Sequence, residues 1–308
     1  MTSLIQRFQA DHPDQLDGTS GWSVNFRQIE GGLMNTTLAV RPTAKMTILG
    51  IKMDKMVHQR GCSPAQCVTF GIPSVAGIRS WNGVDVDRAA ILGFGTAQEF
   101  DSVSNEMHKG LTVTVAVPLL EQVSNETQLP LDQVAGAIFQ AQINVRTEAL
   151  QQLFEYGNCL LDHEQMPFSE AKQKDFLIYL LSAMSNTEKF ADRSDLSKRH
   201  LAVRRAVEIM EHRLQDNISI SDICLVAKTS WRTLDRGFKE YFGFGPNIYR
   251  KCMRLNRVRV ELMLNQEFKK ISDTANKWGF WHMGQFAHDY HKLFNEKPSQ
   301  TIGRKFKN

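Results

Sequence analysis

Four polar side chains near the carboxyl end of the chain have a spacing that would place them on one face of a helix. They stand at i, i+3, i+4 and i+7 in the set Arg232, Asp235, Arg236 and Lys239. An arginine guanidinium matches the O6 and N7 atoms of guanine, so Arg232 and Arg236 are predicted to read bases. Asp235 can accept from a cytosine amino group or pair with a neighbouring arginine. The face therefore predicts contacts with the edges of DNA bases.

A repeated pattern surrounds this face and predicts two copies of one supersecondary unit. Ile220-Ser-Asp222 recurs 51 residues later as Ile271-Ser-Asp273. Phe238, Phe242 and Pro246 recur 52 residues later as Tyr290, Phe294 and Pro298, so the second copy has one extra residue, near Gly279-Phe-Trp281. Each copy reads as a short helix, a tight turn and a longer helix. We expect one unit at 219–243, a linking helix at 246–265 and a second unit at 270–295.

The ends of the helices in the first unit have capping residues. Ser219 with Asp222 matches a capping box, and Ser230 is a good N-cap for the longer helix. Three apolar residues at i, i+4 and i+8 should face inward: Leu234, Phe238 and Phe242. A buried face opposite a polar face is the layout of a helix-turn-helix, whose second helix enters the major groove.

The remaining candidates for DNA contact lie near the starts of the two longer helices. In the first unit they are predicted to meet phosphate or a thymine methyl, and they are Ser230, Trp231 and Thr233. In the second unit, the offset of 52 maps the polar face onto Gly284, Ala287, His288 and His291. There we expect His288 to reach a base and Met283 to contact a thymine methyl. His282 and Gln285 are expected to contact the phosphodiester backbone. We expect the first unit to supply most of the discrimination between bases, and the second unit mainly to bind the DNA and position the protein on it.

These motifs resemble the DNA-binding domain of the AraC/XylS family of bacterial transcription regulators. The matching pieces are Ser230-x-x-x-Leu234-x-x-x-Phe238, Phe242-Gly-Phe-Gly-Pro246, Arg254-Leu255, Gly279-Phe280, Phe286-x-x-x-Tyr290 and Pro298-Ser299. Gly245-Pro-Asn247, Arg254-Leu-Asn256 and Trp278-Gly-Phe-Trp-His-Met-Gly-Gln-Phe286 are similar to the ethanolamine-operon regulator branch. Lys228 departs from the family, which usually has glycine there, so this residue is expected at positive φ.

The resemblance also implies a function for the whole chain. It implies an activator that binds double-stranded promoter DNA, contacts RNA polymerase, and carries a barrel-like domain for effector sensing or dimerisation. In the ethanolamine branch the inducers are ethanolamine and a cobalamin. The identity of an effector for this chain is left open, and no cofactor is expected.

Charge divides the chain in the same place as the motifs. Residues 1–196 hold 15 Lys and Arg against 22 Asp and Glu, whereas 197–308 hold 22 against 11. A basic segment on an acidic one indicates a polyanion-binding module carried by another domain. We expect an effector-sensing and dimerisation domain at 1–190, a linker at 191–199 and the DNA-binding domain at 200–308.

The first domain reads as strands followed by helices, so the fold class is α+β with two domains. Residues 22–120 contain short β-branched or aromatic segments between turn residues, typical of a barrel or cupin-like fold. From about 130 to 185 the apolar period is helical, and its apolar surface suggests a homodimer contact. Four aromatic residues are possible effector contacts, with ordinary core packing as the alternative: Trp22, Phe70, Trp81 and Phe94.

Enzymatic chemistry finds little support in the sequence. His58, His108 and His163 are isolated, and the five cysteines lack metal-site spacing and are predicted to be buried, reduced thiols. No nucleophile motif or phosphate loop occurs. A non-specific architectural DNA binder, or a barrel enzyme tethered to DNA, remain the alternatives. No run of eighteen apolar residues or signal peptide is present, so we expect no membrane contact and a place in the bacterial cytoplasm, at the nucleoid.

Two further groups of residues have a structural interpretation. Aromatic residues at these spacings are usually core, which applies to Trp231, Trp278 and Trp281. A solvated face is the simple interpretation of the basic residues in the linking helix, which are Arg250, Lys251, Arg254, Arg257 and Arg259, although Arg254 can be structural. The terminal Arg304, Lys305 and Lys307 are expected to give diffuse electrostatic support.

Overall fold

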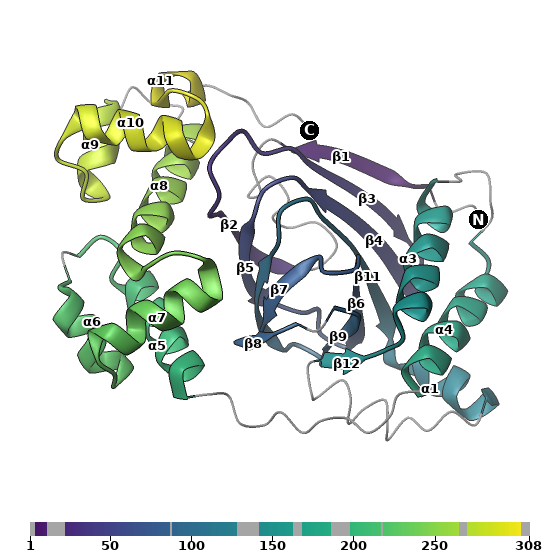
Figure 1. Ribbon diagram of the computed structural model, residues 1–308. Coiled ribbons are helices and arrows are strands. Elements are labelled where there is room, and N and C mark those ends of the chain that lie inside the picture. The colour runs from purple at the N-terminus through teal and green to yellow at the C-terminus, as the bar shows by residue number, and fades with distance from the viewer. Residues whose placement is uncertain are drawn as a thin grey trace.

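Strands and helices separate into two parts that lie side by side (Figure 1). The computed structural model describes residues 4–10, 22–86, 88–127, 142–162, 168–185, 198–216, 218–264 and 270–302. The strands and helices α1, α3 and α4 form the first part, and helices α5 to α11 form the second. The predicted α+β fold class, with a strand-rich first domain followed by helices and an all-helical second domain, is confirmed.

The strands of the first part form two antiparallel sheets that enclose an apolar interior. One sheet has the order β1-β3-β4-β11-β6-β9-β12, which is Gln6–Ala10, Thr36–Pro42, Met46–Met53, His108–Ala116, Cys67–Pro73, Ala90–Phe94 and Gln142–Asn144. The other has the order β2-β5-β10-β7-β8, which is Ser23–Gln28, Val57–Cys62, Glu99–Ser104, Ile78–Trp81 and Val84–Asp85. The barrel-like domain is thus a pair of facing sheets, and we call the space between them the interior.

Three helices cover the outer face of the seven-stranded sheet (Figure 1), and they are α1 (Val117–Thr127), α3 (Thr147–Asp162) and α4 (Glu170–Ser185). Their apolar residues bury the outward side chains of the sheet in one core. Gly157 lets α3 approach closely, because a Cβ there would lie 2.3 Å from Leu111 Cδ1. The predicted helical range of 130–185 is interrupted, since residues 142–144 form β12. Residues 131–139 of that prediction lie outside the described residues.

The second part contains the two predicted helix-turn-helix units, one at each end of a long helix (Figure 1). Its helices are α5 (Lys198–His212), α6 (Ile220–Ala227), α7 (Trp231–Phe242), α8 (Pro246–Leu264), α9 (Ile271–Lys277), α10 (Met283–Phe294) and α11 (Pro298–Thr301). Helices α6 and α7 form the first unit, α9 and α10 form the second, and α8 links them. Of the predicted linker, residues 191–197 are outside the described residues, and so are the terminal basic residues 304–307.

Local capping in the first unit follows the sequence closely. Ser219 and Asp222 form the expected capping box, and Ser230 caps α7 by accepting from the Thr233 amide at 3.3 Å. The residues predicted to face inward are buried, namely Leu234, Phe238 and Phe242. Lys228 ends α6 with φ +53° and ψ +47°, the left-handed conformation expected from the missing glycine.

Four of the five basic residues of α8, Arg250, Lys251, Arg254 and Arg259, have protein partners, which corrects the interpretation of a solvated face for these four. Arg259 is fully buried, pairs with the Glu296 carboxylate at 3.1 Å and lies 4.6 Å from the ring centre of Phe294. Lys251 pairs with Asp289 of α10 at 3.0 Å. These side chains hold the second unit on α8, because a buried guanidinium needs a partner that compensates for lost hydration.

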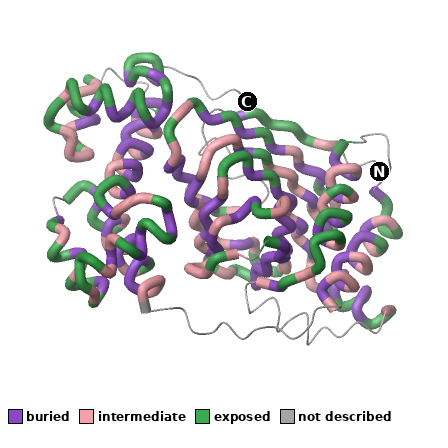
Figure 2. Tube along the Cα trace, in the orientation of Figure 1, coloured by how far each residue is buried: buried purple, intermediate pink, exposed green. Residues whose placement is uncertain are grey.

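The two parts meet where α5, α7 and α8 pack against strands β2, β5 and β10, and Figure 2 shows buried residues on α8 and on the strands beside it. The Asn256 side chain pairs with the main chain of Gln28, donating to its carbonyl at 2.9 Å and accepting from its amide at 3.2 Å. Gln28 Nε2 also donates to the Leu293 carbonyl at the end of α10, at 2.9 Å. The first part therefore touches both the linking helix and the second unit.

Two sequence-level expectations concern thiols and membranes. All five cysteines are free thiols, but only Cys252 is buried as predicted, and the other four are half-buried. Within the described ranges, no helix combines the length and apolarity needed to cross a bilayer.

Replacing Lys228 by glycine should stabilise the first unit. A Cβ in the left-handed region costs about 1–2 kcal/mol, partly offset by the greater entropy of glycine in the unfolded chain. We expect Lys228→Gly to raise the free energy of unfolding by about 0.5–1 kcal/mol in urea denaturation. Lys228→Ala keeps the Cβ and is the control. Equal free energies of unfolding for the glycine and alanine variants would contradict the claim that a Cβ at this position strains the backbone.

Candidate nucleic-acid interface

The exposed face of α7 presents two guanidinium groups to solvent. Arg232 is exposed, and it has no ion-pair partner in the part of the chain that the structure describes. Arg236 lies one turn further along, with 70% of its side chain exposed, and its Nε is 3.1 Å from Glu240 Oε1. The opposite face of α7 is packed into the core of the first unit. Both arginines can therefore reach a ligand without any movement of the helix.

Glu240 holds Arg236 only loosely. Its carboxylate also pairs with Arg199 of α5 at 2.6 Å, and this pair is the main cause that lowers the pKa of Glu240. Exposed ion pairs contribute about 0–1 kcal/mol. Arg236 can thus exchange Glu240 for a base edge at small cost, while Arg199 continues to neutralise the carboxylate.

Other predicted contacts of the first unit already have partners within the helix. Asp235 pairs with Lys239 at 2.7 Å, so its observed partner is a lysine and not an arginine. The Ser230 and Thr233 hydroxyls lie 2.9 Å apart in the N-cap. Trp231 opens α7 with 42% of its surface exposed, which makes it unlike a core residue.

The second unit presents smaller and less polar side chains. His282, Gln285 and His288 are exposed, whereas Met283 is half-buried against the core of this unit. Gly284 has open space around the position of a Cβ, with nothing within 4 Å. Because glycine weakens a helix and no packing requires it here, α10 offers its backbone to close approach by a partner.

Trp281 is a functional candidate that reasoning from sequence missed. Core packing was the more frequent alternative for this residue, yet 73% of its surface is exposed, immediately before the N-cap of α10. Trp278, in contrast, packs between the cores of both units and donates from Nε1 to Glu261 at 2.8 Å. A burial preference cannot separate two tryptophans three residues apart, because only the turn geometry decides which of them points inward.

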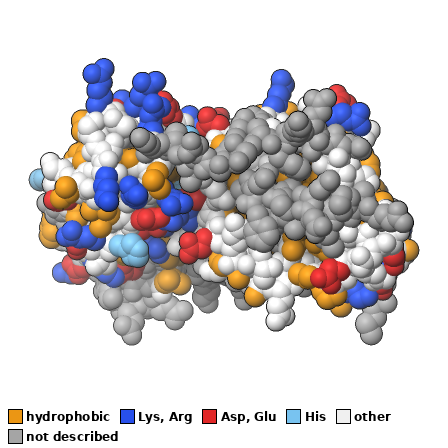
Figure 3. Space-filling model, turned by 90° about the horizontal axis from the view of Figure 1, so that it is seen from below, with side chains coloured by type: hydrophobic (Ala, Val, Ile, Leu, Met, Phe, Trp, Pro, Cys, Tyr) orange, Lys and Arg blue, Asp and Glu red, His pale blue; other side chains and the backbone are white. Residues whose placement is uncertain are grey.

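Lys and Arg side chains gather on the helical part in the view of Figure 3. This face matches the electrostatic footprint that a DNA backbone requires.

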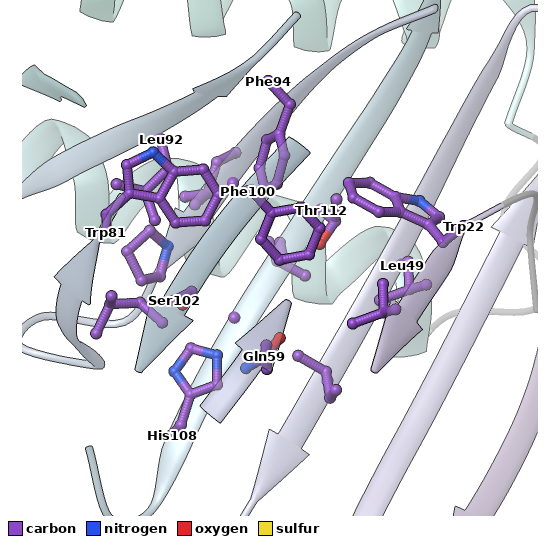
Figure 4. A pocket seen from close by; sticks show the side chains of 18 of the residues that line it. Trp22, Leu49, Gln59, Trp81, Leu92, Phe94, Phe100, Ser102, His108 and Thr112 are labelled. Carbon is purple, nitrogen blue, oxygen red and sulfur yellow. The ribbon is translucent and has the colours of Figure 1, made fainter. Parts of the chain in front are cut away.

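A second candidate site is the interior cavity between the sheets (Figure 4). It has a volume of about 110 Å³ and is lined mainly by apolar side chains. Of the predicted effector contacts, Trp22, Trp81 and Phe94 line it. Phe70 does not line it, because its side chain belongs to the core beneath the outer helices.

The polar groups of the cavity are neutral. None of its described lining residues is Asp, Glu, Lys or Arg, and the polar ones include Gln59, Ser102, His108 and Thr112. His108 Nδ1 lies 3.0 Å from the Gly77 carbonyl, which can only accept, so Nδ1 carries the hydrogen. Burial lowers the pKa of His108 to about 4, which leaves Nε2 as a free acceptor at neutral pH.

The wall of this cavity is also the docking surface of the first unit. On β5, Gln59 lines the cavity, while Nδ1 of the adjacent His58 forms a hydrogen bond of 2.7 Å with the Tyr249 hydroxyl of α8. On β10, Ser102 lines the cavity, while the adjacent Asp101 accepts from the Tyr241 hydroxyl of α7 at 2.8 Å.

An ionic cluster joins the two sides of this contact. His58 Nε2 lies 3.0 Å from Asp101, and Arg60 Nε lies 3.1 Å from the same carboxylate. Burial would raise the pKa of Asp101, but His58, Arg60 and Tyr241 lower it below its ordinary value. Arg27 and Arg60 both pair with Glu211 of α5. The sheet is thus bound to the first unit by directional polar contacts.

Comparison with known proteins places a helix-turn-helix domain family over residues 223–304. The XylDLEGF operon transcriptional activator 1 of Pseudomonas putida is 32% identical over 114 residues, which cover 37% of this chain and 34% of that protein. A probable thc operon regulatory protein of Rhodococcus erythropolis is 29% identical over 101 residues, or 32% of this chain and 30% of that protein. The chain spans about a third of the length of these curated relatives.

A solved structure gives a similar match. A probable AraC family transcriptional regulator from Rhodopseudomonas palustris is 30% identical, and the match covers 33% of this chain and 95% of that one with a TM-score of 0.32.

Removal of the Trp281 indole should weaken DNA binding. A large exposed aromatic beside the start of α10 is placed to lie against the sugar-phosphate backbone. We expect Trp281→Ala to reduce affinity for duplex DNA at least about fivefold, or roughly 1 kcal/mol, in fluorescence anisotropy titrations. Met107→Ala removes an exposed apolar side chain from the first part and should have no effect. Unchanged affinity of the Trp281 variant would exclude this contact.

Proposed function

Because the chain belongs to the AraC/XylS family of bacterial transcription regulators, we propose that it is a sequence-specific DNA-binding regulator whose promoter occupancy responds to a small effector. The observation that carries the proposal is the exposed pair Arg232 and Arg236 on the outer face of α7. Two guanidinium groups one turn apart match a purine edge in the major groove, where each bidentate contact discriminates by about 1–3 kcal/mol. A non-specific architectural binder would not need such a pair.

The two units favour an asymmetric DNA site. Helices α7 and α10 would enter successive major grooves about 34 Å apart on one side of the duplex. Helix α7 supplies long hydrogen-bonding side chains. Helix α10 supplies His288 and, at Gly284, a backbone that the DNA can approach closely. Base discrimination would then reside in the half-element under α7, and the half-element under α10 would contribute mainly affinity.

The remaining partners follow from the family. We include RNA polymerase and a second copy of the chain among them, with α3 and α4 as the candidate contact for the second copy. An activating role in the bacterial cytoplasm, at the nucleoid, belongs to the same proposal. An enzyme tethered to DNA is the less favoured alternative, since no group of metal-ligating residues occurs in the described part of the chain.

The interior cavity supports an effector of defined chemistry. Its volume of about 110 Å³ is somewhat below the roughly 150 Å³ of an apolar cavity that admits benzene. A small uncharged apolar molecule with a hydroxyl, of single-ring size at most, suits this lining, because His108 Nε2 can accept from the hydroxyl. A cobalamin is far too large for it, and the cationic ethanolamine would find no carboxylate among the lining residues.

The shared wall supports a route from effector to DNA. A ligand that displaces Gln59 or Ser102 displaces the same strands that carry His58 and Asp101. Those two residues hold Tyr249 and Tyr241, and Tyr241 lies on α7 itself. The first unit, which carries the arginine pair, would therefore respond to the effector. Coupling of this kind requires different effector affinities in the two states of the contact.

The DNA half of the proposal is tested by saturation mutagenesis of a binding site. A duplex selected from a random library by the full chain is changed at each position, and binding of the wild type, Arg232→Ala and Arg236→Ala is measured. We expect the wild type to lose about 1–3 kcal/mol per wrong base pair in one half-element only. In each arginine variant, changing the base pair at one position of that element should no longer reduce the binding free energy.

A matched control comes from the same helix. Lys239→Ala removes a charge from the face without removing a fork-shaped donor, and it should weaken all duplexes alike. Equal losses in both half-elements, or a specificity ratio near one against random duplex, would overturn the assignment.

The cavity is tested with phenol as the probe. We expect phenol to bind the full chain with a Kd in about the millimolar range or tighter by calorimetry, and benzoate at least about tenfold more weakly, since no cation faces the cavity. Leu49→Phe fills the cavity and should abolish phenol binding. Leu264→Phe, at an exposed position of α8, should not. Preferred binding of benzoate, or binding unaffected by Leu49→Phe, would refute the site.

A further inference from the structure

One side chain of α8 contacts the main chains of both helix-turn-helix units. Arg254 donates from Nε to the Leu214 carbonyl at 3.0 Å and from Nη2 to the Asp216 carbonyl at 2.9 Å, both in the connection that leads into α6. Its remaining nitrogen, Nη1, lies against Gly279 in the turn between α9 and α10. A Cβ at Gly279 would stand 2.9 Å from Nη1 and 3.1 Å from Cζ.

The turn of the second unit is shaped to receive this guanidinium. Gly279 has φ +82°, a conformation that glycine adopts without strain, and the absence of a Cβ leaves the space that Arg254 occupies. Trp278 packs beside it against the cores of both units. Burial lowers the pKa of Arg254 to about 10, with a smaller contribution from Arg250, so the group stays charged at neutral pH.

Other contacts along α8 join it to one unit only. Arg250 donates to the Ile218 and Asp216 carbonyls of the first unit. Lys251 pairs with Asp289 of the second. Apolar packing holds both units on the helix, but it is non-directional and sets their angle weakly. Arg254 adds two hydrogen bonds of fixed direction on one side of its planar group and close packing against Gly279 on the other.

We infer that Arg254 is the positioning residue that sets the separation of the two reading helices, and hence the spacing of half-elements that the protein accepts. The inference rests on the proposed function. One base pair inserted between the half-elements moves one of them by about 3.4 Å and rotates it by about 35° around the duplex. A rigidly joined pair of units cannot follow that change, whereas a loosely joined pair can.

The test measures affinity against spacing. The full chain is titrated with its selected duplex and with derivatives that have one base pair added or removed between the half-elements. For the wild type we expect a loss of at least about 30-fold on either change. For Arg254→Ala we expect weaker binding to the selected duplex, and all three duplexes within about threefold of one another. Circular dichroism checks that each variant is folded.

Two further variants make the outcome specific. Arg250→Ala removes two bonds to the same connection without touching Gly279, and it should keep the sharp spacing preference. Should Arg254→Ala fail to fold, Arg254→Lys, which keeps the charge but loses the planar fork, should show a partly flattened profile. A wild-type profile in a folded Arg254 variant, or the same flattening in Arg250→Ala, would overturn the inference. If the wild type selects no duplex, the proposed function itself fails.

Discussion

Adjacent residues of a β-strand point to opposite sides of the sheet, and this constraint places the interior cavity and the first helix-turn-helix unit on two sides of one wall. Gln59 and Ser102 face the cavity, while their neighbours His58 and Asp101 hold tyrosines of the DNA-binding part. No hinge or long pathway is needed between a bound molecule and the helix that carries the arginine pair. The distance between them is the thickness of one sheet.

The contacts across this wall combine directional hydrogen bonds and ion pairs with an apolar core, in which Ile29 and Val103 of the strand part pack among residues of the helical part. The Asn256 amide pairs with the Gln28 main chain as a neighbouring strand would. Within the DNA-binding part, Arg254 and the buried pair of Arg259 and Glu296 fix the two units on α8.

Much of the DNA-binding part was predictable because its determinants are local. The repeat, the Ser219 and Ser230 caps, and the left-handed Lys228 all follow from short-range geometry. The sequence of strand β5 does not mark its position within the strand-rich range, because its outward residues are polar yet buried by another domain, so apolar alternation is missing there. For the same reason the buried Arg259 resembled a solvated residue: its partner lies 37 residues away. Tertiary contacts decide such positions, and a single sequence does not display them.

The central claim is that the cavity and the first unit are coupled through their common wall. Linkage requires the coupling to be reciprocal, so DNA must change the affinity of a cavity ligand by the factor by which that ligand changes the affinity for DNA. The direct measurement is the Kd of phenol for the full chain, alone and saturated with its selected duplex. The account predicts two values that differ several-fold, and a single value after Tyr241→Phe and Tyr249→Phe are combined. Identical phenol affinities for the free and DNA-bound wild type would contradict it.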